Sequence, residues 1–170
     1  MQDKIKIALI GKSGAGKTEV AKYLEQKHSF VVCNTGKRCR ELAKEFFNSE
    51  SKEVLQKITD SFNSIERGIW LKAALKDIPL YNRNIIIDSL RFIEDYNFAK
   101  SDGFQIWKIE SPHGMRLTRL TNRGQAHKIE NDNHQSETEL QNIPPDIMIN
   151  NSFEDISRLY SLIDEQFGHV

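Results

Sequence analysis

The segment 11–18 carries the strongest chemical signal in the sequence. It reads G-K-S-G-A-G-K-T and fits the pattern G-x-x-x-x-G-K-[ST] at every fixed position. Its glycines allow backbone conformations in which successive N–H groups point at one anion, and the helix that follows adds its positive end. We expect Lys17 to reach the β- and γ-phosphates of ATP and the Thr18 hydroxyl to bind Mg²⁺. The predicted ATP-binding residues of this segment are Gly11, Ser13, Gly14, Ala15, Gly16, Lys17 and Thr18.

Arginines form three groups, each of which follows an expected strand. The groups are Arg38 with Arg40, Arg91 alone, and Arg116 with Arg119 and Arg123. Ligands of α/β proteins bind beyond the carboxyl ends of the strands, and guanidinium groups bind phosphates in a bidentate manner. A single arginine is often a solvated surface charge. Three groups beside one phosphate site favour a kinase, which must neutralise charge on donor and acceptor together.

Other classes of protein that use the same phosphate-binding segment fit the sequence less well. A guanine-nucleotide switch needs an N-K-x-D motif, which does not occur in the chain. Hydrolytic ATPases usually carry a glutamate directly after the aspartate that ends the third strand, whereas Asp88 is followed here by Ser89. A regulatory module that hydrolyses ATP slowly stays open as an alternative from a different class.

Strands and helices alternate along most of the chain. Apolar runs predict strands at Ile5–Ile10, Phe30–Cys33, Asn84–Asp88, Phe104–Ile109 and Asp146–Asn150. Helices are expected at 18–26, at 93–100 and from Ser152, where Asp155 would complete a capping pair. The last helix is expected to bury Phe153, Ile156, Leu159, Ile163 and Phe167. The alternation predicts one domain, 1–170, with a parallel sheet and helices on both faces.

Two stretches interrupt this alternation. Segment 37–80 is helical in pattern, with breaks near 48–49 and before Pro79. Its apolar stripes consist of Leu42, Phe46 and Phe47, and of Ile65, Ile69 and Ala73. Segment 111–143 is polar, and its Ser136–Glu139 stretch predicts a capping box that begins a short helix. We expect Trp70 in the core and His134 on the surface, and leave the role of Glu137 open.

Several segments resemble nucleoside monophosphate kinases. Segment 35–40, T-G-K-R-C-R, resembles the T-G-D-x-L-R segment of adenylate kinases, with lysine in place of the aspartate. Segments 88–91, D-S-L-R, and 67–70, R-G-I-W, resemble the D-x-x-R and R-x-x-W motifs of phage-type deoxynucleoside monophosphate kinases. Segment 134–137 resembles the H-x-S-E motif of that group, and segment 146–150, D-I-M-I-N, resembles the start of its D-x-x-I-x-N ending. The resemblance spans nearly the whole chain.

This resemblance implies a three-layer α/β P-loop kinase fold with five parallel strands in the order 2-3-1-4-5. Segment 37–80 would be the acceptor-binding insert and segment 111–143 the lid. The implied reaction converts ATP and a small-molecule (deoxy)nucleoside monophosphate into ADP and the diphosphate, with magnesium. The residues implied in catalysis are Lys17, Asp88, Arg91, Arg119 and Arg123, and those that hold the acceptor are Thr35, Arg40, Arg67 and Arg91. Thr18 and Asp88 would organise the metal, and Asn150 would join the ATP site.

Two further kinase classes remain as alternatives. Segment 119–123, R-L-T-N-R, resembles the R-L-x-x-R lid of dephospho-CoA kinases, although their D-x-P-L-L motif is absent. A kinase that acts on hydroxymethylated bases in DNA is disfavoured, because 24 basic and 24 acidic residues leave no global field for a polyanion. The chain has no apolar run of the ~20 residues that cross a bilayer. We therefore expect a cytoplasmic protein, monomeric or homodimeric, without a membrane partner, and a nucleic-acid partner is disfavoured but stays open.

Overall fold

A five-stranded parallel sheet forms the centre of the molecule in the computed structural model, which describes residues 4–76, 78, 82–124 and 132–167. Its strands are β1 (Lys6–Ile10), β2 (Val31–Cys33), β3 (Ile85–Ile87), β4 (Gln105–Glu110) and β5 (Ile147–Asn150). They lie in the order β2-β3-β1-β4-β5, with Ile7 beside Ile86 and Leu9 beside Trp107. The predicted three-layer α/β fold and strand order are confirmed.

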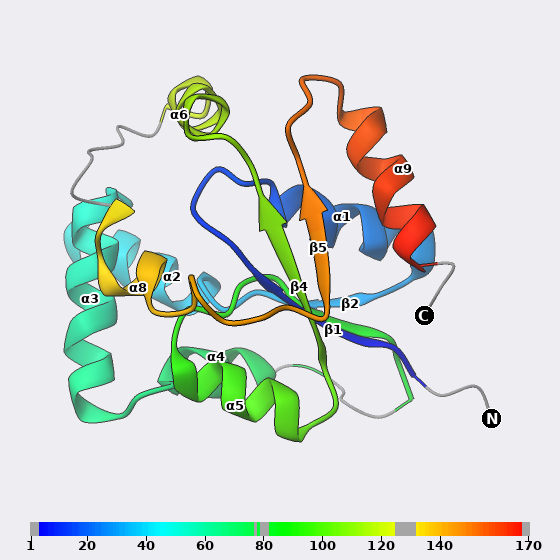
Figure 1. The fold of residues 1–170 in the computed structure, drawn as a ribbon. Helices are drawn as coiled ribbons and strands as arrows, with labels where there is room; N and C mark the ends of the chain where they lie inside the picture. The colour runs from blue at the N-terminus through cyan, green and yellow to red at the C-terminus, as the bar shows by residue number, and fades with distance from the viewer. Residues whose placement is uncertain (1–3, 77, 79–81, 125–131, 168–170) are drawn as a thin grey trace.

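Helices cover both faces of the sheet (Figure 1). The first face carries α1 (Lys17–His28) and α9 (Ile156–Phe167), and the second carries α4 (Ile69–Leu75) and α5 (Ile93–Ser101). Successive side chains of β1 alternate between the two cores: Ile7 and Leu9 join the first, whereas Ala8 and Ile10 join the second. This two-sided burial explains why the strands read as continuous apolar runs.

The helical insert consists of α2 (Lys37–Phe47), α3 (Lys52–Ile65) and α4, which pack around a third core. That core holds Cys39, Ala43, Ile58 and Trp70, as expected for the tryptophan. The predicted break at 48–49 is present. A second break, which the sequence pattern did not predict, separates α3 from α4 at Gly68, whose φ of 76° favours glycine.

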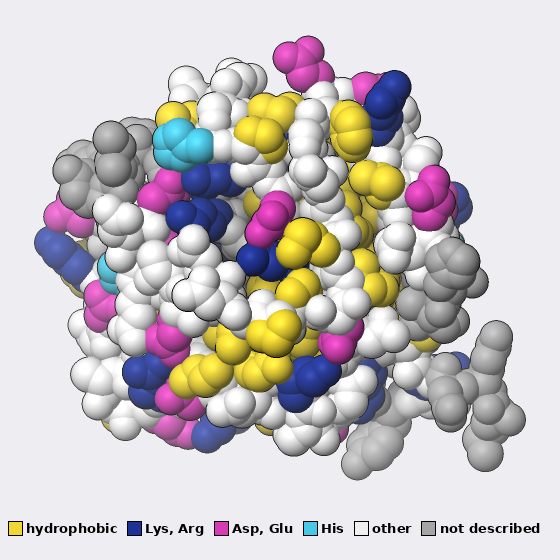
Figure 2. All heavy atoms as spheres, viewed as in Figure 1, with side chains coloured by type: hydrophobic (Ala, Val, Ile, Leu, Met, Phe, Trp, Pro, Cys, Tyr) yellow, Lys and Arg dark blue, Asp and Glu magenta, His cyan; other side chains and the backbone are white. Residues whose placement is uncertain are grey.

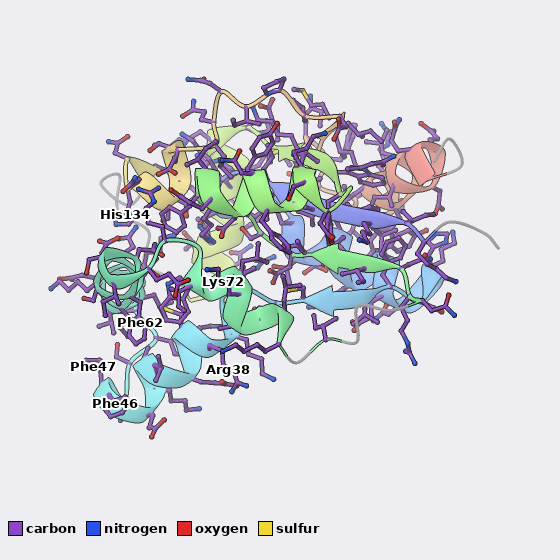
Figure 3. The ribbon with its side chains drawn as sticks, turned by 90° about the horizontal axis from the view of Figure 1, so that it is seen from below. Arg38, Phe46, Phe47, Phe62, Lys72 and His134 are labelled. Atoms are coloured by element: carbon purple, nitrogen blue, oxygen red, sulfur yellow. The ribbon has the colours of Figure 1, made fainter. Side chains whose placement is uncertain are left out.

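Three apolar residues of the insert's stripes are exposed. Phe46 is 69%, Phe47 61% and Ile65 84% exposed, and both phenylalanines lie at the outer end of α2 (Figure 3). Cys39 and Ala43, one to two turns earlier, make the buried contact of α2 with α3. Phe46 and Phe47 lie on the same side of α2 as these buried residues, but the contact with α3 ends before it reaches them. Helical periodicity cannot tell where along a helix such a contact ends.

The last helix begins at Ile156 rather than at Ser152, so the predicted capping pair is wrong. Asp155 acts as the cap, because its Oδ1 accepts the N–H of Ser157 at 2.9 Å. The residues before Asp155 are held in an irregular conformation by Arg119, which donates to the carbonyl of Phe153 at 3.0 Å. Leu159 and Ile163 are buried as predicted, but Phe153 is half-buried and Ile156 is 44% exposed. The side chain of Phe167 lies outside the described residues.

Segment 111–143 contributes α6 (His113–Asn122) and the short α8 (Gln135–Thr138), while its residues 125–131 lie outside the described part of the chain. The predicted capping box is wrong in one respect: His134, not Ser136, caps α8. The imidazole Nδ1 of His134 accepts the N–H of Ser136 at 3.2 Å, and the His134 side chain is only 20% exposed. Among the described residues, none of the helices is both long and apolar enough to span a bilayer.

Candidate active site

The P-loop (residues 11–18) connects β1 to α1, and two of its glycines are fixed by contact. Gly11 and Gly16 have φ values of 140° and 111°. A Cβ at Gly11 would lie 2.3 Å from the carbonyl oxygen of Ile109, and one at Gly16 would lie 2.4 Å from Nδ2 of Asn151. No other residue fits these positions without moving the backbone, so the motif's glycines are required by the fold as well as by the ligand.

Lys17 begins α1 and its ammonium group is turned onto the P-loop itself. Its Nζ donates to the carbonyl oxygens of Gly11 at 2.5 Å and of Lys12 at 3.1 Å. Burial, and then the charge of Arg91, lowers the pKa of Lys17 to about 7. A bound phosphate would supply the negative charge that these neutral carbonyls lack, and would favour the protonated lysine.

The carboxylate of Glu137 joins three separate parts of the site. It accepts the N–H and the hydroxyl of Ser13 at 2.8 and 2.6 Å, Nζ of Lys52 at 2.6 Å, and Nη1 of Arg91 at 2.8 Å. Burial alone would raise its pKa, but the charges of Arg91, Lys52 and Lys17 together hold the pKa of Glu137 well below its usual range. The carboxylate is therefore ionised and locks the P-loop, α3 and the segment after β3 together.

Lys52 is a functional candidate that the sequence analysis missed. It is the first residue of α3, where a positive charge is unfavourable because the helix dipole is positive at that end. It nevertheless points inward, onto Glu137 and the hydroxyl of Ser13 at 3.1 Å, with its side chain 23% exposed. A lysine directly after the N-cap Ser51 was the signal that could have found it.

The acceptor side of the site is built around Asp88, directly after β3. Its Oδ1 accepts the N–H and hydroxyl of Thr35 at 3.0 and 3.3 Å, and burial raises the pKa of its carboxyl group. Arg40, on the first turn of α2, donates to Oδ1 of Asn34 at 2.8 Å. The carboxyl ends of β2 and β3 thus bring Thr35, Arg40 and Asp88 to one edge of the sheet.

These groups line a cleft of about 560 Å³, called here the phosphate cleft. It brings together most of the predicted site residues, namely Ser13, Gly14, Gly16, Lys17, Thr18, Thr35, Arg40, Asp88, Arg91 and Arg123. Its lining contains five cationic side chains, those of Lys17, Arg40, Lys52, Arg91 and Arg123, and two carboxylates, those of Glu50 and Asp88. The excess of positive charge favours ligands that carry several negative charges.

Helix α6 packs against the P-loop through two arginines. Arg116 is buried, forms an ion pair with Asp132 at 2.9 Å and donates to the carbonyl of Ser13 at 3.0 Å. Arg119 donates to Ser111 Oγ at 2.9 Å and to the carbonyl of Gly14 at 3.4 Å, and it does not line the phosphate cleft. Arg119 therefore holds the outside of the P-loop, while Arg123 of the same segment lines the cleft.

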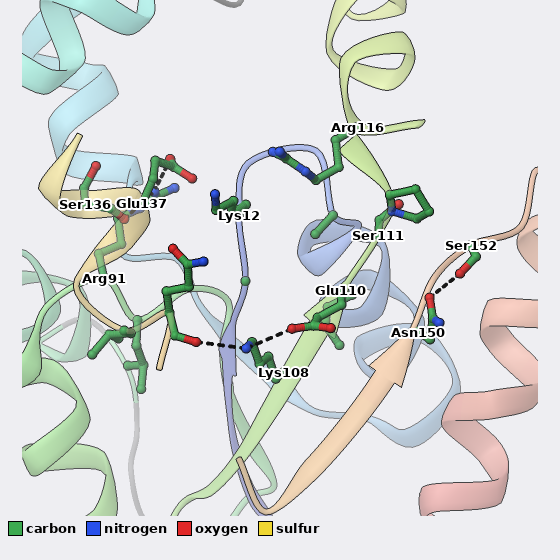
Figure 4. Close-up of a pocket in the computed structure, with 17 residues that line it drawn as sticks. Lys12, Arg91, Lys108, Glu110, Ser111, Arg116, Ser136, Glu137, Asn150 and Ser152 are labelled. Carbon is green, nitrogen blue, oxygen red and sulfur yellow. Dashed lines mark hydrogen bonds and ion pairs between the residues drawn. The ribbon is translucent and has the colours of Figure 1, made fainter. Parts of the chain in front are cut away.

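Besides Arg119, four predicted site residues do not line the phosphate cleft: Gly11, Ala15, Arg67 and Asn150. Arg67 is exposed and pairs with Glu94 at 2.8 Å and with Glu139 at 2.6 Å. Asn150 lines a separate cavity of about 360 Å³ between the P-loop, β4 and α8, drawn in Figure 4. In Figure 2, dark-blue Lys and Arg side chains lie set back in the hollow of this same face.

Asn151, which the sequence analysis also missed, contacts the P-loop directly. It is buried and its Nδ2 donates to the carbonyl of Ala15 at 2.8 Å. Asn150, its neighbour, instead bonds to the hydroxyl of Ser152. Successive side chains of a strand point to opposite faces, so the P-loop contact falls on the residue just after β5.

The oxygen atoms on the two walls of the phosphate cleft suit magnesium. The hydroxyl of Thr18 and the carboxylate of Asp88 both line the cleft. Within the described residues there is no group of three His, Cys, Asp or Glu side chains that could hold a metal ion alone. Mg²⁺ in phosphoryl-transfer sites is held by one or two protein oxygens, with substrate phosphates and waters as the remaining ligands, so these residues fit it.

The model of an AAA domain family matches residues 7–140, which include the P-loop, the insert and α8. The chain belongs to this family. Together with the strand order, the match confirms the predicted P-loop nucleoside monophosphate kinase superfamily. A curated relative of this AAA-domain chain is a cytidylate kinase from Methanocella arvoryzae, which is 29% identical over 136 residues, or 77% of this chain and 71% of the relative.

Solved structures share the fold of this AAA-domain chain. Deoxyadenosine kinase from M. mycoides with bound dCTP has a TM-score of 0.57 and 16% identity, and the match covers 98% of this chain and 100% of that one. Shikimate kinase from Acinetobacter baumannii in complex with shikimate has a TM-score of 0.58 and 13% identity, with 98% and 92% covered. At these identities the likeness concerns the fold alone. The prediction of an ATP-dependent kinase agrees with the names of all three proteins.

Proposed function

We propose that this protein is an ATP-dependent kinase that transfers the γ-phosphoryl group of ATP to a nucleoside monophosphate and releases the diphosphate. Deoxynucleoside monophosphates are the first acceptors we propose. One observation carries the proposal. The phosphate cleft has Lys17 and Thr18 of the P-loop on one wall and Arg40 and Arg91 on the other. A cleft with separate cationic groups for two anions suits a donor and an acceptor that each carry phosphate.

On the donor side, the backbone N–H groups of the P-loop bind the phosphates of ATP. Lys17 leaves the carbonyl of Gly11 and binds the transferring group, whose charge Arg123 also offsets. Arg119 keeps the P-loop in place from outside the cleft, through its bonds to Gly14 and Ser111. Thr18 and Asp88 hold Mg²⁺, which neutralises charge on the phosphates when bound.

On the acceptor side, Arg40, Arg91 and Thr35 hold the monophosphate of the acceptor. Glu137 positions Arg91, because its carboxylate accepts from the guanidinium at 2.8 Å. Segment 37–80 acts as the acceptor-binding insert and segment 111–143 as a lid that excludes water. A cytoplasmic location, a monomeric or homodimeric state, and roles for Arg67 and Asn150 in binding acceptor and ATP are part of the same proposal.

An ADP-release assay with a panel of acceptors tests this proposal. The panel contains ribo- and deoxynucleoside monophosphates, the corresponding nucleosides, dephospho-CoA, hydroxymethylated DNA and no acceptor. We expect fast ADP formation only with monophosphates. Slow ADP formation that no acceptor increases indicates the ATP-hydrolysing regulatory module, and stimulation by dephospho-CoA or DNA alone indicates the corresponding alternative kinase.

A further inference from the structure

A smaller cavity of about 110 Å³, called here the inner cavity, opens from the acceptor side of the phosphate cleft. Helices α2, α3 and α4 and the segment that leads into α5 form its walls. It shares with the cleft the residues Thr35, Gly36, Arg40, Lys52, Leu55, Ser89 and Arg91. An acceptor whose phosphate lies between Arg40 and Arg91 therefore extends its other end into the inner cavity.

Three residues that line the inner cavity each carry a buried polar atom without a hydrogen-bond partner in the described part of the chain. The atoms are Nε1 of Trp70, Oγ of Ser89 and Oδ1 of Asp95, and their residues are 8%, 8% and 5% exposed. Leaving a buried polar group unpaired costs about 1–3 kcal/mol, so such groups in native proteins require an explanation. All three residues line one cavity at the acceptor end of the cleft, which makes a ligand bound there the natural source of the missing partners.

The three atoms differ in the partners they need. The indole Nε1–H of Trp70 can only donate, the hydroxyl of Ser89 can donate or accept, and the carboxylate of Asp95 accepts. Trp70 is packed against Phe62, with ring centroids 5.0 Å apart, so the indole does not turn freely. The matching ligand edge must therefore offer at least one N–H donor and one lone-pair acceptor.

Asp95 is also fixed in place, and by only one of its two oxygens. Its Oδ2 accepts the backbone N–H of Phe92 at 3.3 Å and that of Arg91 at 3.4 Å, which caps the first turn of α5. Its Oδ1 has no such partner among the described residues. The residue that bears the free oxygen is thus tied to the same backbone segment as Arg91, which would hold the acceptor's phosphate.

We propose that Asp95, Trp70 and Ser89 read the base of the acceptor, and that this base is a 4-aminopyrimidine of the cytosine type. The inference rests on the proposed nucleoside monophosphate kinase function and names its acceptor. The exocyclic amino group of cytosine donates to Oδ1 of Asp95, and its ring nitrogen and carbonyl oxygen accept from Trp70 and Ser89. Uracil and thymine carry a carbonyl oxygen where cytosine has the amino group, and that oxygen would face the carboxylate with no proton between them.

Purines are the nearest competitors of cytosine for these groups. Adenine carries the same amino group beside a ring nitrogen, and guanine carries other N–H donors. Both have two fused rings, whereas the inner cavity has about 110 Å³ against about 560 Å³ for the phosphate cleft. We therefore place the single-ring base first. Adenosine and guanosine monophosphates therefore serve as outcomes of the test rather than as parts of the proposal.

The test compares kcat/KM of the full chain for CMP, dCMP, UMP, dTMP, AMP and GMP at saturating ATP. We expect CMP or dCMP to exceed every other acceptor, and UMP and dTMP by about a hundred-fold or more, because the mismatched bases leave buried groups unpaired. If the protein phosphorylates monophosphates but prefers UMP, dTMP or a purine, this inference is wrong and the proposed function stands. If it phosphorylates none of them, the proposed function itself is wrong.

Two variants assign the preference to the named residues. Asp95→Asn keeps an oxygen to cap α5 and turns an N–H donor toward the cavity. We expect kcat/KM for the cytosine nucleotides to fall about ten- to a hundred-fold and that for UMP or dTMP to rise, a combination that loss of fold does not produce. Trp70→Phe keeps the ring and removes the donor, and should raise the acceptor KM while the KM for ATP stays unchanged.

Trp107→Phe is the matched control. Trp107 is fully buried in the core beneath α1, and its Nε1 donates to Gln105 at 3.1 Å, away from both cavities. It should lower stability without changing the order of acceptors. An unchanged order in both Asp95→Asn and Trp70→Phe, with thermal melts showing folded protein, would overturn the assignment. If Asp95→Asn does not fold, Ser89→Ala takes its place in the same comparison.

Discussion

The two ends of the cleft differ in how their polar groups are satisfied before any ligand binds. At the P-loop end the protein supplies its own partners: Lys17 bonds to the Gly11 carbonyl, and Glu137 accepts from Ser13. At the acceptor end, Trp70 and Asp95 keep buried atoms without a partner among the described residues. The proposed donor site must exchange internal contacts for phosphate, whereas the proposed base site has no such contacts of Trp70 Nε1 or Asp95 Oδ1 to give up among the described residues.

This difference has a physical origin in charge. A concentration of cations around the P-loop would be unstable without an internal anion, and the buried carboxylate of Glu137 supplies it between Lys52 and Arg91. At the acceptor end, the indole N–H is neutral and can be left unpaired at a cost of about 1–3 kcal/mol, and the Asp95 carboxylate keeps backbone N–H partners on its other oxygen. The four predictions below test each end of the comparison, from the largest effect to the smallest.

Replacement of Lys17 by alanine has the largest expected effect on activity. Loss of one cationic contact to the transferring group should lower kcat by at least a hundred-fold, or on the order of 3 kcal/mol. Steady-state ADP release measures the loss. Lys22→Ala on the same helix is the control, because Lys22 is exposed and its Nζ makes a long surface ion pair of 3.8 Å with Oε1 of Glu19. Equal turnover of Lys17→Ala and wild type would remove Lys17 from the site.

Replacement of Glu137 by glutamine should lower the free energy of unfolding by on the order of 3 kcal/mol, because three cations lose their buried counter-charge. The folded-state pKa of Glu137 is depressed by Arg91, Lys52 and Lys17 against the effect of burial. Its stabilisation is therefore present above the unfolded-state pKa of about 4.3 and is lost as pH falls below it.

Denaturant melts of Glu137→Gln and wild type from pH 7 down to pH 3 check this prediction. The gap in unfolding free energy should be constant from pH 6 to 7 and should shrink below pH 4. Glu139→Gln is the control, since Glu139 lies on the same segment but pairs with the exposed Arg67. A difference in unfolding free energy that does not depend on pH would show that Glu137 stabilises the fold by its shape and not by its charge.

Replacement of Arg40 or Arg91 by alanine tests the acceptor side of the phosphate cleft. Each should raise the acceptor KM about ten- to a hundred-fold and change the KM for ATP much less, because a charge-assisted contact to phosphate contributes about 1.5–3 kcal/mol. Arg91→Lys should recover only part of the loss. Arg38→Ala on α2 is the control, because Arg38 is exposed and pairs with Glu41. Parallel rises of both KM values would contradict an acceptor-specific role.

Proton uptake on ATP binding is the smallest predicted effect. Burial and the charge of Arg91 lower the pKa of Lys17 to about 7 in the free protein, so at pH 8 most of the lysine is neutral. Phosphate favours the charged form, and binding at pH 8 should therefore take up close to one proton, against about none at pH 6. Calorimetric titration in two buffers of different ionisation enthalpy measures this number. Equal uptake at both pH values would rule out Lys17 as its source.

The parts of the structure that the sequence predicted are those that local pattern determines. The P-loop is contiguous, and the strands are buried on both faces, so each reads as a short motif or an apolar run. Where local pattern was misleading, tertiary contacts decided the outcome: Arg119 holds the chain irregular before α9, and His134 takes the capping role expected of Ser136.

The rest of the site depends on partners far apart in the chain. Ser13 and Glu137 are separated by 124 positions, and Lys52 and Glu137 by 85. No spacing rule connects such residues, so the sequence predicted no role for Glu137 and did not identify Lys52 as a site residue. Trp70 was correctly expected in the core, but helical periodicity places a whole side chain and cannot tell that its N–H is left without a partner among the described residues.

Transfer of a γ-labelled phosphoryl group from ATP to an unlabelled nucleoside monophosphate tests the central claim most directly. The product is separated by chromatography after incubation with magnesium, with and without the acceptor. The account predicts label in the nucleoside diphosphate, in an amount equal to the ADP formed, and little free phosphate. Label that appears only as inorganic phosphate, at the same rate with and without acceptor, would contradict the claim that this protein is a nucleoside monophosphate kinase.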